Sequence, residues 1–130
     1  MTREEMRMLY WESNAFVLPT RGEGWCLPVA EAMSIGLPVI VTNYSGPTAY
    51  ADNTNAFLVP LDDKDDLNGY VSPSVEILSQ HMRNVFENPQ TAAAKGFAAR
   101  ETMQKLSPEY VVSEMVQRLK HHANMRGWGV

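Results

Sequence analysis

Two apolar runs, separated by a glycine-containing corner and a helical segment, constrain the fold of this chain more than any other feature. The runs cover residues 15–18 and 38–42. Unbroken apolar runs of this length are typical of strands covered on both faces, as in a parallel sheet. Between them, Leu27 to Ile35 is mostly apolar, with Pro28 in a first-turn position and Gly36 where a helix commonly stops. The order strand, turn, helix, strand predicts an α/β fold.

The remaining sequence extends this unit at both ends. Thr2 and Glu5 have the spacing of a capping box, which predicts an opening helix, and residues 56–59 predict a third parallel strand. An acidic surface loop is expected at 61–72. We therefore expect one partial Rossmann-like domain over 1–130, in which 1–60 form the strand and helix part and 73–126 form a helical tail.

The tail is expected to hold three helices. Ser72-Pro73 and Ser107-Pro108 have the form of an N-cap followed by a first-turn proline, and Gly96 is expected to weaken the middle helix. Apolar side chains at helical spacing predict an apolar stripe along one face of the first and third of these helices. The stripes consist of Val75, Leu78, Met82, Val85 and Phe86, and of Val112, Met115, Val116 and Leu119.

Composition narrows the function classes. The net charge of −4 comes without a cluster of Lys and Arg, so nucleic acid is an unlikely partner by charge alone. A single cysteine, Cys26, excludes an internal disulfide, and no export signal or membrane-length apolar run is present in the sequence. These features predict a cytoplasmic protein with no transmembrane segment.

The stretch from Pro19 to Met33 is where ligand chemistry is expected. A strand that ends in a turn and runs directly into a helix aims backbone N–H groups and the positive end of the helix dipole at the carboxyl edge of the sheet. That place suits a phosphate. Gly22 and Gly24 are expected to allow close backbone approach to a ligand or the left-handed angles of a tight corner.

Glu31 is the only charged residue between Glu23 and Asp52. The surrounding helix is otherwise apolar or small, so we expect it to be largely buried, and a buried carboxylate needs a partner. Two ribose hydroxyls could donate hydrogen bonds to its oxygens. Alternatively, Glu31 is a partly exposed helical residue, or it accepts bonds from backbone N–H groups or from a cation elsewhere. The residues alone leave these readings open.

The segment Glu23 to Met33, EGWCLPVAEAM, resembles the E-x7-E signature of retaining glycosyltransferases with the GT-B fold, the glycosyl transferases group 1. Its surroundings agree in order: 16–21 resembles the strand before the motif, 36–42 the strand after it, and Ser45-Gly46-Pro47 and 55–60 follow. The resemblance is nearly continuous from the first helix to Pro60 and implies the C-terminal, donor-binding half of the fold.

The resemblance also implies roles for individual residues. Glu23 would be the catalytic residue beside the donor sugar, backbone amides from Gly24 to Leu27 would face the distal phosphate, and Glu31 would take the ribose hydroxyls. The implied donor-binding set is Gly22, Gly24, Trp25, Cys26, Leu27 and Glu31. The implied reaction transfers a sugar from a nucleotide diphosphate sugar with retention. It needs no metal or other cofactor, because cationic side chains and helix dipoles stabilise the leaving diphosphate.

Some features depart from the family pattern. Cys26 replaces a small residue, and Ala49 stands where a glutamate is common. The basic arginine and lysine pair and the acceptor-binding domain of the family would precede this chain, and Arg21 is the one cation near the motif. We therefore expect weak donor binding and no transfer by the chain alone. The alternative is a non-catalytic nucleotide- or partner-binding module that recruits the missing N-terminal domain or another chain at its open sheet edge.

Other candidate sites have simpler explanations. The Asp62 to Asp66 string contains a D-x-D pattern but is expected to be a solvated turn, and His81 and His121-His122 lack the spacing of metal ligands. Cys26 has no histidine nearby in sequence that would activate it as a nucleophile. Trp25 could stack on a sugar or a base, or pack against the sheet.

Overall fold

The sheet contains three parallel strands in the order β1-β2-β3, which are β1 (Phe16–Leu18), β2 (Val39–Thr42) and β3 (Phe57–Val59). The computed structural model describes residues 2–62 and 71–128. Val17 lies opposite Ile40, and Val41 lies opposite Leu58. All four residues of β2 are buried, because helices cover both faces of this central strand. The predicted α/β fold with three parallel strands is confirmed.

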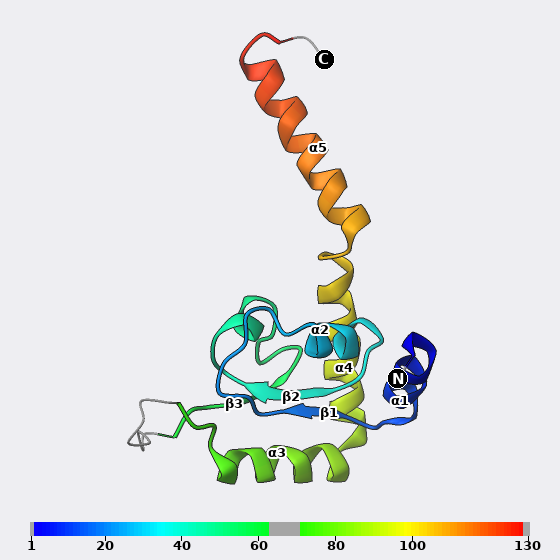
Figure 1. Ribbon diagram of the computed structural model, residues 1–130, viewed down its shortest axis with the longest axis vertical. Coiled ribbons are helices and arrows are strands. Elements are labelled where there is room, and N and C mark those ends of the chain that lie inside the picture. Colours follow the sequence, from blue (N-terminus) through cyan, green and yellow to red (C-terminus); the bar gives the residue numbers. More distant parts are fainter. Residues whose placement is uncertain (1, 63–70, 129–130) are drawn as a thin grey trace.

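Helix α2 (Leu27–Ser34) covers one face of the sheet and α3 (Val75–Glu87) covers the other, as Figure 1 shows. The side chains of β2 alternate between these faces. Val39 and Val41 pack in a core cluster with Val29 and Met33 of α2, whereas Ile40 packs in a second cluster with Val85 of α3. The two-residue period of the strand therefore builds both halves of the core.

Helix α4 (Pro89–Gln104) contacts both α3 and α2. A Cβ added to Gly96 would lie 2.1 Å from the carbonyl oxygen of Gly36, which itself has a left-handed φ of +84° after the end of α2. Gly96 is buried and lets the α4 backbone approach this corner. The expectation that Gly96 only weakens its helix was therefore incomplete, because the residue is a packing contact.

The opening helix α1 (Arg3–Glu12) has the predicted capping box, in which Thr2 Oγ1 accepts from the amide of Glu5 and the Glu5 carboxylate accepts from the amide of Thr2. Tyr10 of this helix is buried in the α2-side core. After β2, a single turn of 3-10 helix, η1 (Gly46–Ala49), returns the chain toward β3. η1 lies beyond the carboxyl end of β2, whereas α1 lies at the amino end of β1, as Figure 1 shows.

The expected cap of the first tail helix was wrong. Helix α3 begins at Val75 with Ser74 as its N-cap, because Pro73 instead forms a β-bridge with Leu61 across the loop. The predicted stripe is only partly buried: Val85 is buried and Leu78 half-buried, while Val75 and Phe86 are exposed. Most of the 61–72 loop, including residues 63–66 of the D-x-D string, lies outside the described residues.

Helix α5 (Pro108–Met125) begins at the predicted cap, where Ser107 Oγ accepts from the amide of Tyr110. It contains no buried residue, so its predicted stripe lies exposed rather than packed against the sheet. In Figure 1 the helix extends away from the sheet toward the C-terminus. In the described part of the chain, no helix is both long and apolar enough to cross a membrane.

Candidate functional site

The segment that follows β1 is fastened to the end of β2. Thr42, the last residue of β2, is buried and donates a hydrogen bond from Oγ1 to the carbonyl oxygen of Thr20 at 2.7 Å. Because parallel strands end at the same edge of a sheet, the corner carrying the E-x7-E segment and the turn carrying Ser45 lie together at the carboxyl edge. This edge is the position at which open α/β sheets bind ligands.

The backbone of Glu23 is held from both sides by that turn. Its amide donates to Ser45 Oγ at 2.9 Å, and its carbonyl oxygen accepts from the amide of Gly46 at 3.0 Å. A Cβ added to Gly46 would lie 1.8 Å from the carbonyl oxygen of Gly24, so only glycine fits there. The Glu23 side chain is half-buried.

Tyr50 fastens two further residues of the corner, Trp25 and Cys26. Its buried hydroxyl donates to the carbonyl oxygens of Trp25 at 2.7 Å and Cys26 at 3.1 Å. Its ring lies 4.8 Å from that of Trp25, centroid to centroid. Trp25 is 43% exposed, so it rests on Tyr50 with one side open to solvent. Sequence reasoning missed both Gly46 and Tyr50, and only the Ser45-Gly46-Pro47 wording gave a signal for the first.

The start of α2 presents a set of backbone donors. Within residues 2–62 and 71–128, the amides of Gly24, Trp25, Cys26 and Leu27 have no hydrogen-bond acceptor. Cys26 is the N-cap residue, and its side chain makes no capping hydrogen bond. These amides and the positive end of the α2 dipole can therefore meet an anion.

The conformational reason expected for the corner glycines was wrong. Among the described glycines, only Gly36 and Gly127 have a left-handed φ, and the left-handed residue of the corner is Cys26, with a φ of 66°. A Cβ added to Gly24 would meet nothing within 4 Å. A Cβ on Gly22 would reach only ordinary contact, 3.9 Å from the Tyr44 ring. The other reason expected for these two exposed glycines, close backbone approach to a ligand, stays a prediction.

Cys26 is buried, and this burial raises the pKa of its thiol, although the amide of Val29 opposes the shift. A raised pKa keeps the sulfur protonated at neutral pH and a poor nucleophile. The side chain is therefore a packing group, and only the backbone of Cys26 faces the candidate anion site.

The expectation that Glu31 lies in a largely buried helix was wrong. Val29, Ala32 and Met33 take the buried face of α2, and the Glu31 side chain lies on the exposed face. Its carboxylate therefore remains hydrated and does not need a ligand to offset a desolvation cost. Its Oε2 accepts a hydrogen bond from the hydroxyl of Tyr10 at 3.4 Å, and burial, followed by the charge of Glu31, raises the pKa of that phenol.

The predicted site residues are nonetheless grouped in space. Glu23 to Leu27 form one corner, and Glu31 follows Leu27 by one helical turn, so both lie on the same outward face of α2. Leu27 is 65% exposed. The arrangement is an open surface with a row of amides at one end and a carboxylate at the other.

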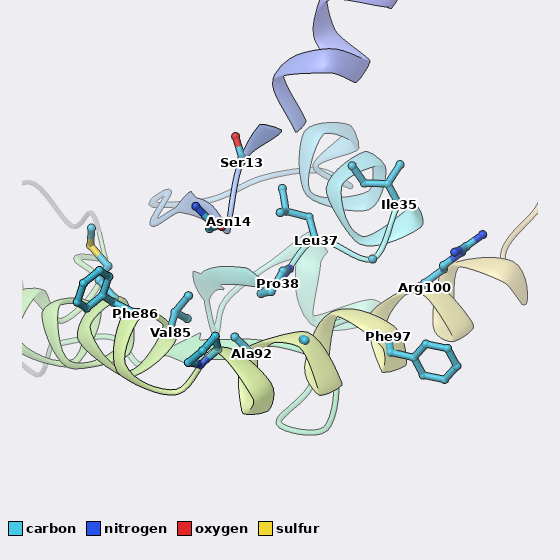
Figure 2. A pocket seen from close by; sticks show the side chains of 14 residues that line it. Ser13, Asn14, Ile35, Leu37, Pro38, Val85, Phe86, Ala92, Phe97 and Arg100 are labelled. Carbon is cyan, nitrogen blue, oxygen red and sulfur yellow. The ribbon is translucent and has the colours of Figure 1, made fainter. Parts of the chain in front are cut away.

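A hollow of about 730 Å³ lies elsewhere, at the opposite edge of the sheet. Figure 2 shows Asn14 and Pro38, which precede β1 and β2, facing Val85 and Ala92 of the helices below. Ligands of open parallel sheets bind beyond the carboxyl ends of the strands, so this amino-edge hollow is separate from the candidate site.

The histidine set aside in the sequence has a structural contact. His81 Nε2 lies 3.0 Å from the carbonyl oxygen of Leu58, and its ring packs on Phe57. In the part of the chain that the structure describes, no three His, Cys, Asp or Glu residues are grouped to hold a metal ion.

The sequence model of the family described as glycosyl transferases group 1 matches residues 1–74, more than half of the chain. The chain therefore belongs to this family, and the predicted family is confirmed. The family match ends just before α3, so it covers all three strands and the whole candidate site.

The known proteins similar to this chain include a curated relative and a solved structure. A UDP-Gal:alpha-D-GlcNAc-diphosphoundecaprenol alpha-1,3-galactosyltransferase of Escherichia coli is 29% identical over 111 residues, covering 84% of this chain and 28% of that protein. The solved structure of sucrose-phosphate synthase from Thermosynechococcus elongatus superposes with a TM-score of 0.67 at 23% identity, over 97% of this chain and 29% of that one. The second likeness confirms the fold. The chain spans less than a third of the length of either protein.

Proposed function

We propose that this chain is the donor-binding half of a retaining glycosyltransferase that transfers a sugar from a nucleotide diphosphate sugar. Family membership and the E-x7-E segment support this proposal. Within it, Glu23 lies beside the donor sugar and Glu31 binds the ribose hydroxyls. No metal takes part, because N–H groups and the helix dipole offset the charge of the leaving diphosphate.

The observation that carries the proposal is the row of amides from Gly24 to Leu27 at the start of α2. A family member that uses a diphosphate leaving group needs donors at the carboxyl edge, and these four have no acceptor among the described residues. Hydrogen bonds donated by the Gly46 amide and the Tyr50 hydroxyl fix the peptides that carry the amides of Gly24, Cys26 and Leu27. A fixed donor array binds an anion without a further cost of ordering the loop.

Glu31 is exposed, so its proposed role does not depend on burial. A contact with Tyr10 supports that role instead. Its carboxylate accepts one hydrogen bond from Tyr10, which limits its rotamers and leaves lone pairs for two ligand hydroxyls. Charged hydrogen bonds of this kind contribute roughly 1.5–3 kcal/mol each. In this proposal the ribose lies beside Glu31, one helical turn beyond Leu27.

Titration of UDP, GDP and ADP by calorimetry tests the proposal. At least one of them should bind, and Glu31→Ala should reduce that affinity about 10- to 100-fold. Glu87→Ala, an exposed carboxylate at the end of α3, is the matched control and should bind as the unmodified chain does. Absence of binding to all three nucleotides would refute the donor site.

The second candidate is a partner-binding module, and two observations favour it. β1 pairs only with β2 in the described sheet, and α5 exposes apolar side chains such as Leu119, which is 67% exposed. Unpaired strand edges and apolar faces recruit other chains. The partner is the acceptor domain of the family or another chain, and co-expression followed by co-purification tests its docking.

We also propose a cytoplasmic location, since Cys26 is a free buried thiol.

A further inference from the structure

Tyr50 links three parts of the molecule. Its backbone follows η1, its side chain is 5% exposed, and its hydroxyl reaches across to the corner before α2. There it donates to two consecutive carbonyl oxygens, those of Trp25 and Cys26. The one proton of this phenol is therefore shared between two successive peptide groups of the candidate site, and the Cys26 carbonyl also accepts from the amide of Ala30 at 3.2 Å.

The direction of a carbonyl determines the direction of the next amide. In a trans peptide the C=O of one residue and the N–H of the next point in opposite directions, and the described chain contains no cis peptide. The two carbonyls held by Tyr50 belong to the same peptide groups as the amides of Cys26 and Leu27. Both amides consequently point away from Tyr50, and neither has an acceptor among the described residues.

Tyr50 is itself held in place by Asn55, which also bonds to helix α4. Its carbonyl oxygen accepts from Asn55 Nδ2 at 2.9 Å, and the same amide group donates to Thr102 Oγ1 of α4 at 3.1 Å. Asn55 is 2% exposed. Burial raises the pKa of the Tyr50 phenol far above neutrality, so its proton remains available for donation.

We infer that Tyr50 is a positioning residue for a nucleoside diphosphate, because its hydroxyl turns the Cys26 and Leu27 amides toward the distal phosphate. This inference rests on the proposed donor site and adds to it a residue outside the E-x7-E segment. Tyr50 touches no ligand. Its effect is confined to the phosphate end, since Glu31 lies one turn further along α2 and is not bonded to it.

The test compares a nucleoside diphosphate with its own nucleoside. Tyr50→Phe keeps the ring and removes only the hydroxyl, so it should reduce the affinity for whichever of UDP, GDP and ADP binds tightest about 5- to 30-fold. The affinity for uridine, guanosine or adenosine should stay within twofold. Tyr110→Phe, on exposed α5, is the matched control and should change neither. Thermal unfolding of each variant checks that the fold is intact.

A purely structural role would produce a different result. An unchanged diphosphate affinity, or an equal loss for diphosphate and nucleoside, would overturn the inference while leaving the donor site intact. Amide NMR provides an independent measurement with inorganic pyrophosphate as the probe. The Cys26 and Leu27 signals should shift in the unmodified chain and not in Tyr50→Phe, and equal shifts in both would contradict the inference. Absence of any nucleotide or pyrophosphate binding to the unmodified chain would refute the donor site and this inference with it.

Discussion

At Gly46 the turn after β2 comes into backbone contact with the corner after β1. The Gly46 amide bonds to Glu23, and the space that a Cβ would need is occupied by the Gly24 carbonyl. A backbone carbonyl in a fastened corner has little freedom to move. The contact therefore couples the stability of the fold to the geometry of the site.

We predict that Gly46→Ala destabilises the protein by about 1–3 kcal/mol, because the added methyl group must displace the corner backbone. Chemical denaturation measures the change in the free energy of unfolding. Gly24→Ala is the matched control, since its Cβ would point into open space, and it should change this free energy by less than about 0.5 kcal/mol. Equal effects of the two substitutions would show that the Gly46 contact is not a steric limit.

Individual site residues differed in how far the sequence could define them. The corner from Glu23 to Leu27 could be located from the sequence motif, because its residues are consecutive in the chain. The burial of the helix around Glu31 was predicted wrongly, because its charges were counted without separating its faces, whereas an exposed Glu31 was one of the alternatives that the sequence left open. Gly46 and Tyr50 were not predicted, since their roles depend on distances between two loops that only the folded sheet brings together.

Among the elements, the contact between α2 and α4 depends on a glycine at each side. Gly36 takes the left-handed conformation that ends α2, and Gly96 offers no side chain where α4 passes. Apolar periodicity predicted which segments form strands and which form helices, and the structure confirms these assignments. The burial of the tail helices could not be predicted in the same way. An apolar stripe indicates that one face of a helix favours contact, but it does not identify the surface that covers this face.

We predict that Gly96→Ala destabilises the protein by about 1–3 kcal/mol, although alanine favours a helix by about 1 kcal/mol over glycine. The steric effect dominates because the atom in the way is the Gly36 carbonyl oxygen, not a flexible side chain. Thermal and chemical denaturation measure the change. The reverse substitution Ala94→Gly, at an exposed position of the same helix, reports the helix propensity alone. A stabilised Gly96→Ala variant would show that the close approach is absent.

For the whole molecule, side-chain burial is concentrated in the sheet and its covering helices. β2 is buried throughout, whereas α5 contributes no residue to either core cluster. Opening of α5 therefore exposes little new apolar surface, and its amides should exchange without global unfolding. This difference in burial between the sheet and α5 depends on the packing of the whole molecule, so the periodicity of the helix alone could not predict it.

We predict that hydrogen exchange is slow in β2 and much faster in α5. As a matched pair, Val41→Ala should lower the free energy of unfolding by about 1–3 kcal/mol, and Val116→Ala by less than about 0.5 kcal/mol. Val41 is 1% exposed and Val116 is 43% exposed. Equal protection of the two elements, or equal costs of the two substitutions, would contradict this division of stability.

The link from Asn55 to Thr102 determines where the chain can be shortened in the laboratory. The family match ends at residue 74, yet α4 supplies the hydroxyl beside the Asn55 amide and the side chains of Ala99 and Met103 against α2. An expression fragment cut at residue 74 would retain every motif residue and lose the support behind Tyr50. The shortest fragment suited to nucleotide screening therefore ends after Gln104.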